Sequence, residues 1–241
     1  MKKTLLFITF FVTYLNYSQV IKFENPNFEK VVLTKYPEID INKNGNIDYD
    51  ESQTITKLDL MDLKVENAND VKHFKNLTYL SLTNNNIVDF KLEGLQSLKE
   101  LYIARNRLKD IQISNLPSLE RFACGLNQLE KVKISNCPNI VSLNMMDNKI
   151  DELNLKPFKK LKYLTVDNNK LKKLDLSNNL DLIQIVINKN EIEVIDIIKN
   201  QNLKMNILYL DEKVKIIGTE NQLKEYQVAP TIMTEEPSRA K

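Results

Sequence analysis

The sequence predicts an α/β-type repeat fold: a single solenoid of parallel β-strands with a mostly irregular convex side, preceded by a short helical cap. Two observations lead to this prediction. Apolar residues and one asparagine recur every 21 residues through most of the chain, and a short amphipathic helical pattern comes before them. Of the 241 residues 42% are hydrophobic, so a large core is available. Because no single unit of this size can bury its apolar face alone, neighbouring units must stack.

The repeat frame begins at residue 77 and holds through six units of 21 residues. In each unit apolar residues occupy offsets 0, 3, 5, 10, 13 and 15, and an asparagine occupies offset 8. The alternation at offsets 3 and 5 is that of a short β-strand with one buried face, and offsets 13 and 15 repeat it on the far side. The asparagines are Asn85, Asn106, Asn127, Asn148, Asn169 and Asn190. Their amides can satisfy backbone groups at the bend, so we expect a buried ladder.

This frame resembles the leucine-rich repeat signature L-x-x-L-x-L-x-x-N-x-L, as in "LKYLTVDNNKL" from residue 161. The resemblance covers residues 55–213, with a degenerate first unit at 55–76 and a decaying last unit from Leu203. The 21-residue units are similar to those of exported bacterial proteins, including the internalin group and proteins of gliding Bacteroidetes. The resemblance implies a leucine-rich repeat solenoid whose concave face binds a partner, most readily a protein, with a glycan as the alternative.

The outward side chains of the first strands form the candidate binding face. The offset-2 row is Tyr79, Glu100, Arg121, Ser142, Tyr163 and Gln184, and the offset-4 row is Ser81, Tyr102, Ala123, Asn144, Thr165 and Val186. Tyrosine and arginine are enriched in binding hot spots. The candidate partner-binding residues are Tyr79, Tyr102, Arg121, Met146 and Tyr163, with Tyr79 and Tyr102 as diagonal neighbours. The alternative is an ordinary solvated sheet face on a structural surface component without a specific ligand.

The stretch "DINKNGNIDYDE", residues 40–51, follows the EF-hand calcium-loop frame D-x-[DN]-x-[DN]-G-x-I-x-x-x-E. Gly45 stands at loop position 6, where the backbone must turn with a positive φ. Calcium prefers several hard oxygen ligands, and this segment supplies them contiguously. The predicted ligands are Asp40, Asn42, Asn44, the carbonyl of Asn46, Asp48 and Glu51. The sequence therefore predicts a single Ca²⁺ ion as cofactor, with a polar turn as the alternative.

The segments beside the loop indicate what such an ion does. Residues 25–37 read as a short helix, with Asn25 or Asn27 as its N-cap. After the loop only one helical turn fits before the strand "TKLDL", and the sequence contains no second loop to pair with the first. We therefore expect a structural ion that holds the cap over the first repeat unit, rather than a calcium sensor. The resemblance to bacterial leucine-rich proteins with a calcium-binding N-terminal cap implies the same.

The N-terminal residues read as an export signal. Lys2 and Lys3 precede the apolar run "TLLFITFFVTYL", which is short for a membrane span. A retained membrane anchor is the alternative. We expect a secreted or cell-surface protein, with the periplasm possible and no transmembrane segment after signal removal. The predicted organisation is a signal peptide at 1–18, a helical cap at 19–54, the solenoid at 55–213, and a C-terminal cap remnant with a flexible tail at 214–241.

Charge, cysteine and histidine content narrow the function further. The chain carries 34 basic and 32 acidic residues, and loss of Lys2 and Lys3 leaves 32 of each, so nothing favours nucleic acid as a partner. Cys124 and Cys137 could form a disulfide or remain buried thiols. The single histidine, His73, is expected in a surface loop, and no catalytic constellation can be built around it. We therefore predict a binding module and not an enzyme, with acid–base catalysis by a pair of carboxylates as the remaining alternative.

Overall fold

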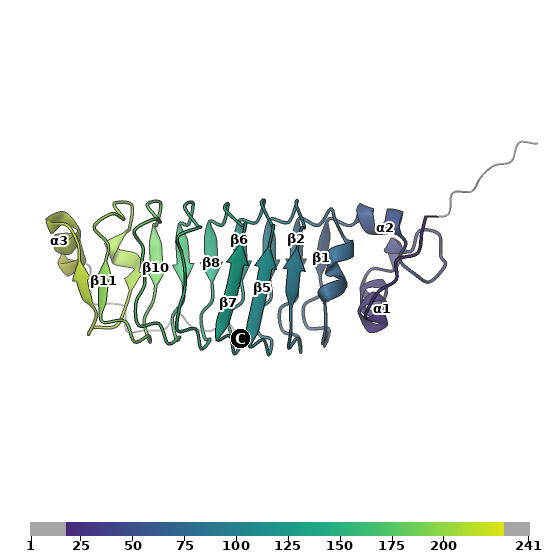
Figure 1. Ribbon diagram of the computed structural model, residues 1–241, viewed down its shortest axis with the longest axis horizontal. Helices are drawn as coiled ribbons and strands as arrows, with labels where there is room; N and C mark the ends of the chain where they lie inside the picture. Colours follow the sequence, from purple (N-terminus) through teal and green to yellow (C-terminus); the bar gives the residue numbers. More distant parts are fainter. Residues whose placement is uncertain (1–17, 229–241) are drawn as a thin grey trace, which may run out of the picture.

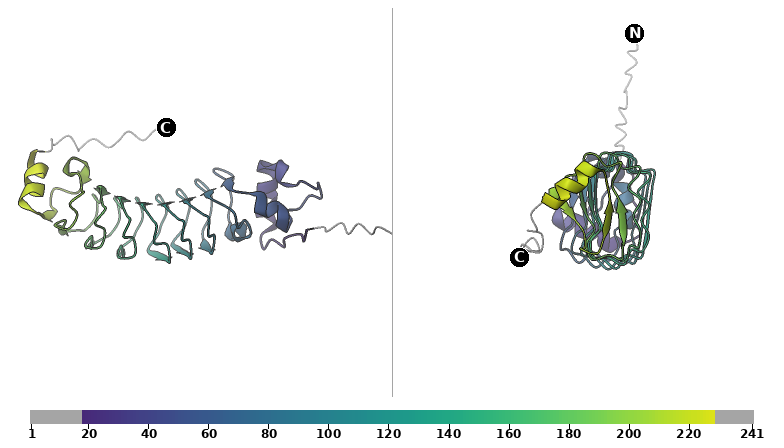
Figure 2. Two further views of the ribbon diagram at one scale, coloured as in Figure 1. Left: turned by 90° about the horizontal axis from the view of Figure 1, so that it is seen from above. Right: turned by 90° about the vertical axis from the view of Figure 1, so that its left-hand side faces the viewer.

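The computed structural model describes residues 18–228, which form one curved solenoid with a helical cap at its N-terminal end (Figure 1). The predicted signal peptide, apart from Ser18, and the tail from residue 229 lie outside the described residues. Seen from above, the stacked turns bow gently, with the cap at one end and a last helix at the other (Figure 2). The predicted fold class, a parallel-strand repeat solenoid with a short helical N-terminal segment, is confirmed.

One strand from each turn joins the main sheet, an eight-stranded parallel sheet that lines the concave side. In order its strands are β1 (Lys57–Asp59), β2 (Tyr79–Ser81), β4 (Glu100–Tyr102), β6 (Arg121–Ala123), β8 (Ser142–Asn144), β9 (Tyr163–Thr165), β10 (Gln184–Val186) and β12 (Leu208–Tyr209). Each strand pairs with the same position of the next turn, so that Leu80 lies opposite Leu101. The constant repeat length therefore sets the register of the whole sheet.

The opposite, convex layer is only partly regular. Strands β3 (Lys91–Glu93), β5 (Asp110–Ser114) and β7 (Lys131–Ser135) form a three-stranded parallel sheet, and β11 (Val194–Asp196) pairs with β13 (Lys215–Ile217). Between these two sheets the units that begin at 140 and 161 have no strand in this layer. Two 3-10 helices, η2 (Asn69–His73) and η3 (Met205–Ile207), lie in the first and last units, and α3 (Glu220–Val228) follows β13.

Apolar residues at the predicted offsets fill the space between the two layers. In the second complete unit Leu101, Ile103 and Leu108 are fully buried, and the same slots are buried in the neighbouring units. Fully burying one such side chain stabilises the fold by roughly 1.5–3 kcal/mol. The core is therefore continuous from the cap to the last turn, as the contacts among its buried residues show.

The six asparagines form the predicted ladder. The Asn106 amide donates to the carbonyl of Leu82 in the preceding turn (2.9 Å) and to that of Ile103 in its own turn (3.2 Å), while its Oδ1 accepts the N–H of Ile87 (3.0 Å). Asn85, Asn127, Asn148, Asn169 and Asn190 repeat these bonds to both turns. Each amide thus pairs backbone groups that the bend leaves without sheet partners.

The residue before each ladder asparagine has a left-handed backbone, which the sequence analysis did not predict. The φ angles are positive at Asn84, Arg105, Leu126, Asp147, Asn168 and Lys189. For a residue such as Leu126 (φ 56°) this conformation costs roughly 1–2 kcal/mol. The hydrogen bonds of the adjacent asparagine offset that strain, because they form only when the chain turns this sharply.

A second, shorter amide ladder lies on the convex side near the C-terminal end. At offset 18 the earlier units carry apolar residues, whereas the last two carry Asn179 and Asn200, both fully buried. Asn200 Nδ2 donates to the carbonyl of Asn179 (2.8 Å), and Gln222 of α3 donates to that of Asn200 (3.2 Å). The C-terminal helix therefore closes the solenoid by supplying the next amide in the ladder.

The N-terminal cap consists of α1 (Pro26–Lys35), η1 (Pro37–Ile39) and α2 (Tyr49–Thr54). Asn25, one of the two predicted candidates, is the N-cap of α1, and the helix buries Phe28 and Val32 against the first turns. The Tyr36 hydroxyl donates to the Asp59 carbonyl (3.1 Å) and accepts the Asp59 N–H (2.9 Å). Because Asp59 lies on the outermost strand, β1, this side chain pairs backbone groups that no preceding strand covers.

Candidate partner-binding face and candidate calcium loop

The concave rows predicted at offsets 2 and 4 lie in register across the main sheet. Pairing places Tyr79 beside Glu100, Glu100 beside Arg121, and Ser142 between Arg121 and Tyr163. The offset-4 row runs in the same way from Ser81 through Tyr102, Ala123, Asn144 and Thr165 to Val186. The strand geometry therefore presents one continuous array of side chains on this face, in which Ser81 at the N-terminal end of the offset-4 row is buried (1% exposed).

Five of these side chains form a connected group, which we call the tyrosine cluster: Lys57, Tyr79, Glu100, Tyr102 and Arg121. The rings of Tyr79 and Tyr102 lie 5.6 Å apart between centroids, as the predicted diagonal contact requires, and Lys57 Nζ lies 4.8 Å above the Tyr79 ring. Glu100 accepts the Tyr102 hydroxyl (2.6 Å) through one oxygen and the Arg121 guanidinium (3.1 Å) through the other. The cluster is thus held in one arrangement before any partner arrives.

The other two candidate residues lie outside the cluster, on the next turns. Met146 follows β8, and its side chain lies over Gly125 of the preceding turn. A Cβ added to Gly125 would be only 3.0 Å from the Met146 Cγ. Tyr163 lies on β9 and keeps 42% of its surface exposed. The strand β8 separates Tyr163 from Arg121, so the face divides into a preorganised cluster and a more open half.

Sequence reasoning missed Lys57 and the role of Glu100. Lys57 pairs with Tyr79, which lies 22 residues further along the chain rather than 21, so the regular offset skips it. Glu100 was placed in the offset-2 row, but only the structure shows that it joins Tyr102 to Arg121. An acid with a tyrosine two residues along its own strand and an arginine at the same offset of the next turn is the signal that could have identified this bridge.

The candidate calcium loop has the backbone that its sequence requires. Gly45 has a φ of 80°, as expected for loop position 6. The Asp40 carboxylate accepts the N–H groups of Asn44 and Gly45 (both 2.9 Å), and Asn44 Oδ1 accepts that of Asn46 (2.8 Å). These bonds wrap residues 40–46 around the Asp40 side chain, while Asn42 and Asn44 stay exposed at the rim.

The second half of the loop holds two buried carboxylates, Asp48 (3% exposed) and Glu51 (4% exposed). They form a reciprocal capping box at the start of α2, and Glu51 Oε1 also accepts the Ile41 N–H (2.8 Å). The Asn42 amide donates to Asp48 (2.9 Å), which joins the two halves of the loop. Within residues 18–228 neither acid has a lysine, arginine or histidine at ion-pair distance.

The donor set suits a hard cation, although the structure gathers the acids only in part. Buried carboxylate oxygens without a basic partner, together with amide and carbonyl oxygens, are the ligand type that calcium selects. Over the described residues, however, no three His, Cys, Asp or Glu side chains converge as a metal-binding group. The Asp48 and Glu51 carboxylates each accept the backbone N–H of the other residue. The Asp40 carboxylate instead accepts backbone N–H groups in the first half of the loop.

His73 corrects one expectation. It lies in η2 and not in a surface loop, and its ring packs 5.5 Å from that of Phe23. Its Nε2 is 3.6 Å from the buried Asp70, and desolvation lowers the pKa of His73 from 6.5. Cys124 and Cys137 are free and buried, and burial raises the pKa of both thiols. None of these groups adjoins the tyrosine cluster in the main sheet.

The described part of the chain contains the α-helices α1, α2 and α3. None of its helices combines the length and apolarity that crossing a bilayer requires.

Tyr102 provides a spectroscopic test of the tyrosine cluster. Burial, followed by the hydrogen bond to Glu100 and the negative charge of Glu100, raises the pKa of Tyr102 from 10.0 to about 12. We expect Glu100→Gln to lower this pKa without restoring 10.0, because burial remains. The folded state holds this proton more tightly than the unfolded chain, so its contribution to stability is lost as pH rises from 10.0 towards about 12. Absorbance titration of the phenols measures the shift.

The matched control is Glu93→Gln, which removes an exposed acid from the convex strand β3. It should leave the tyrosine titration unchanged. A Glu100→Gln variant with the titration curve of the parent chain would contradict the bridge that we describe.

Three solved structures are similar to this chain at low identity. They are the functional domain of InlJ from Listeria monocytogenes, which includes a cysteine ladder (18% identity, 70% of this chain and 56% of that chain, TM-score 0.38); the leucine-rich repeat protein LIC12759 of Leptospira interrogans (18%, 73% and 59%, 0.48); and the internalin inlF from Listeria monocytogenes str. 4b F2365 (16%, 85% and 93%, 0.27). The chain thus spans less than two thirds of the first two.

No curated protein matches the chain. The Leucine Rich Repeat family model matches residues 76–98, which contain β2 and β3. That segment is one turn of the stack, and the other turns repeat its strand and its ladder asparagine in the same register. The fold of this chain is a leucine-rich repeat solenoid.

Proposed function

We propose that this chain is a recognition module that binds a protein partner on its concave face, with the tyrosine cluster as the main contact. The observation that carries the proposal is the preorganisation of that cluster. Two aromatic rings and one guanidinium are fixed by mutual contacts on a rigid sheet. Side chains of these types dominate binding energy at protein interfaces, and prior ordering lowers the entropy that association costs.

Three further parts of the proposal rest on sequence. The apolar N-terminal run and its preceding lysines favour export to the cell surface or the medium. A glycan is the second candidate partner, because tyrosine rings and paired polar groups also suit sugar surfaces. A non-enzymatic role fits the single histidine and two cysteines of the sequence, together with the finding that no three histidines, cysteines or acids converge among residues 18–228.

The proposal includes a Ca²⁺ ion in the cap. Asp40, Asn42, Asn44, the Asn46 carbonyl, Asp48 and Glu51 would hold it, and it would neutralise two buried acids that have no basic partner among the described residues. When bound, calcium supplies charge and cross-links the two halves of the loop. With the ion bound, the six ligand residues would stabilise the cap. The cap also carries Tyr36, whose hydroxyl pairs with the backbone of the edge strand β1.

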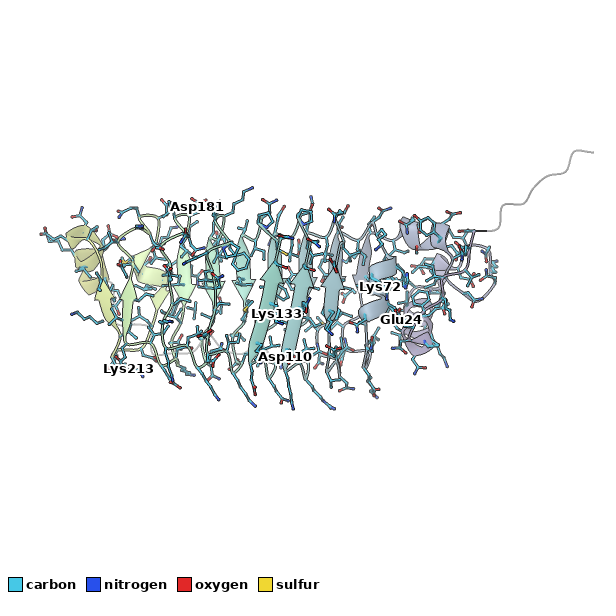
Figure 3. All side chains as sticks on the ribbon, viewed as in Figure 1. Glu24, Lys72, Asp110, Lys133, Asp181 and Lys213 are labelled. Carbon is cyan, nitrogen blue, oxygen red and sulfur yellow. The ribbon has the colours of Figure 1, made fainter. Side chains whose placement is uncertain are left out.

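The binding proposal is tested with Arg121→Ala. Proteins retained from surface extracts by the immobilised parent chain are identified, and their affinities for each variant are measured by surface plasmon resonance. We expect Arg121→Ala to weaken binding at least about tenfold, because a hot-spot side chain contributes ~2 kcal/mol or more. Lys133→Ala is the control, since Lys133 lies on the convex strand β7 (Figure 3).

Equal affinities of Arg121→Ala and the parent chain would exclude the tyrosine cluster as the contact. Loss of retention after enzymatic deglycosylation of the extract would assign the partner to the glycans. An absence of saturable binding, together with self-association, would favour a structural surface role instead.

The calcium proposal is tested by thermal unfolding with excess calcium and with chelator. An ion that binds only the folded cap adds about 2.7 kcal/mol at a concentration 100 times its Kd, so the melting temperature should rise. Glu51→Gln should abolish that rise. Asp50→Asn should keep it, because Asp50 is an exposed acid of α2 outside the predicted ligand set.

For each variant the melting temperature in calcium is compared with that in chelator. Any destabilisation by loss of the capping box at Glu51 is present in both conditions and therefore cancels. Superimposable melting curves of the parent chain in the two conditions would refute the site.

A further inference from the structure

The start of the described chain is paired with the candidate calcium loop. Val20 forms an antiparallel bridge with Asp48. The Ile21 N–H donates to the Ile47 carbonyl (3.1 Å), and the Tyr49 N–H donates to the Gln19 carbonyl (2.9 Å). Residues 19–21 thus lie alongside residues 47–49 of the loop, a pairing that the sequence did not predict.

The backbone groups that bond to the N-terminal segment belong to, or lie next to, predicted calcium ligands. Asp48 pairs with Val20 through its main chain, while its carboxylate bonds to Asn42 and to the Glu51 N–H. The Asp50 N–H also donates to the hydroxyl of Ser18 (2.9 Å), the last residue of the predicted signal peptide, so this one bond belongs to the chain that still carries the signal. A change that loosens the loop between Asn42 and Glu51 therefore moves the groups that hold residues 18–21.

The following residues are held by other means. The Asp70 carboxylate, 1% exposed, accepts the N–H groups of Glu24 (3.1 Å) and Asn25 (2.7 Å). The Phe23 ring packs against Phe74 of the first turn with 6.2 Å between centroids. Lys72 pairs with Glu24 at the same junction, where Figure 3 shows both side chains. These contacts involve no residue of the calcium loop.

The two halves of the segment therefore differ in what holds them. Residues 18–21 depend on a few hydrogen bonds to the loop, and Val20 remains 47% exposed. Residues 23–25 depend on a buried carboxylate and on aromatic packing against the solenoid. Local opening begins where buried apolar contacts are fewest, so residues 18–21 should open first.

We propose that the calcium loop is a metal-dependent clasp for the N-terminal segment: an ion on residues 40–51 holds residues 18–21 against the loop, and its removal frees them while residues 23–25 stay docked. This inference rests on the proposed calcium site. Without the ion the carboxylates of Asp48 and Glu51 are buried with no basic partner among the described residues, and the backbone N–H groups that they accept belong to the segment that carries the bridge. The ion would offset this cost of burial, and the clasp therefore sets how firmly residues 19–21 stay paired with the loop.

The test is amide hydrogen exchange by NMR on the parent chain, with calcium alone as the probe and a chelator as the reference. We expect calcium to slow exchange of the Ile21 and Tyr49 amides by about tenfold, because both donate across the bridge. The Glu24 and Asn25 amides, which donate to Asp70, should not change and serve as internal controls. Asp50→Asn should behave as the parent chain does, and Glu51→Gln should lose the calcium effect.

Three results would overturn the clasp, and they differ in what they say about the metal. Calcium that raises the melting temperature but leaves the Ile21 and Tyr49 exchange unchanged would exclude the clasp and keep the calcium site. Calcium that changes neither quantity would exclude both. Equal slowing at Glu24 and Asn25 would also contradict it, since the whole cap would then be responding.

Discussion

Pairing between turns through buried asparagine amides is the interaction on which the rest of this structure depends. The main strands are at most three residues long, so sheet hydrogen bonds alone secure little of each turn. Each ladder asparagine adds bonds to backbone groups of two turns and so closes the bend that follows the strand. Because every bend closes in the same way, side chains of equal offset align on the concave face, and the tyrosine cluster can form.

A stack of this kind leaves two open ends, and the chain closes them with different side chains. At the N-terminal end the Tyr36 hydroxyl pairs with both backbone groups of Asp59 on the outer strand. At the other end Gln222 of α3 supplies an amide in place of a further asparagine. The Tyr36 hydroxyl thus joins the cap to β1, the strand that also carries Lys57 of the tyrosine cluster.

Most of the fold could be predicted from the sequence because its period is constant, and the failures occur where that period or its residue types change. The extra residue in the first unit hid Lys57, and the replacement of apolar residues by Asn179 and Asn200 went unnoticed. The candidate calcium loop could be proposed from the sequence because its predicted ligands are contiguous. Its pairing with residues 18–21 was not, because two short segments far apart in sequence carry no pattern that joins them.

The central claim is that the amide ladder holds the turns together. Urea unfolding of Asn106→Ala, compared with Asn154→Ala at an exposed position, measures this most directly. Truncating Asn106 leaves buried backbone groups of two turns without partners, so the account predicts a loss of about 2–4 kcal/mol in the free energy of unfolding. A loss no larger than that of the exposed control would contradict it.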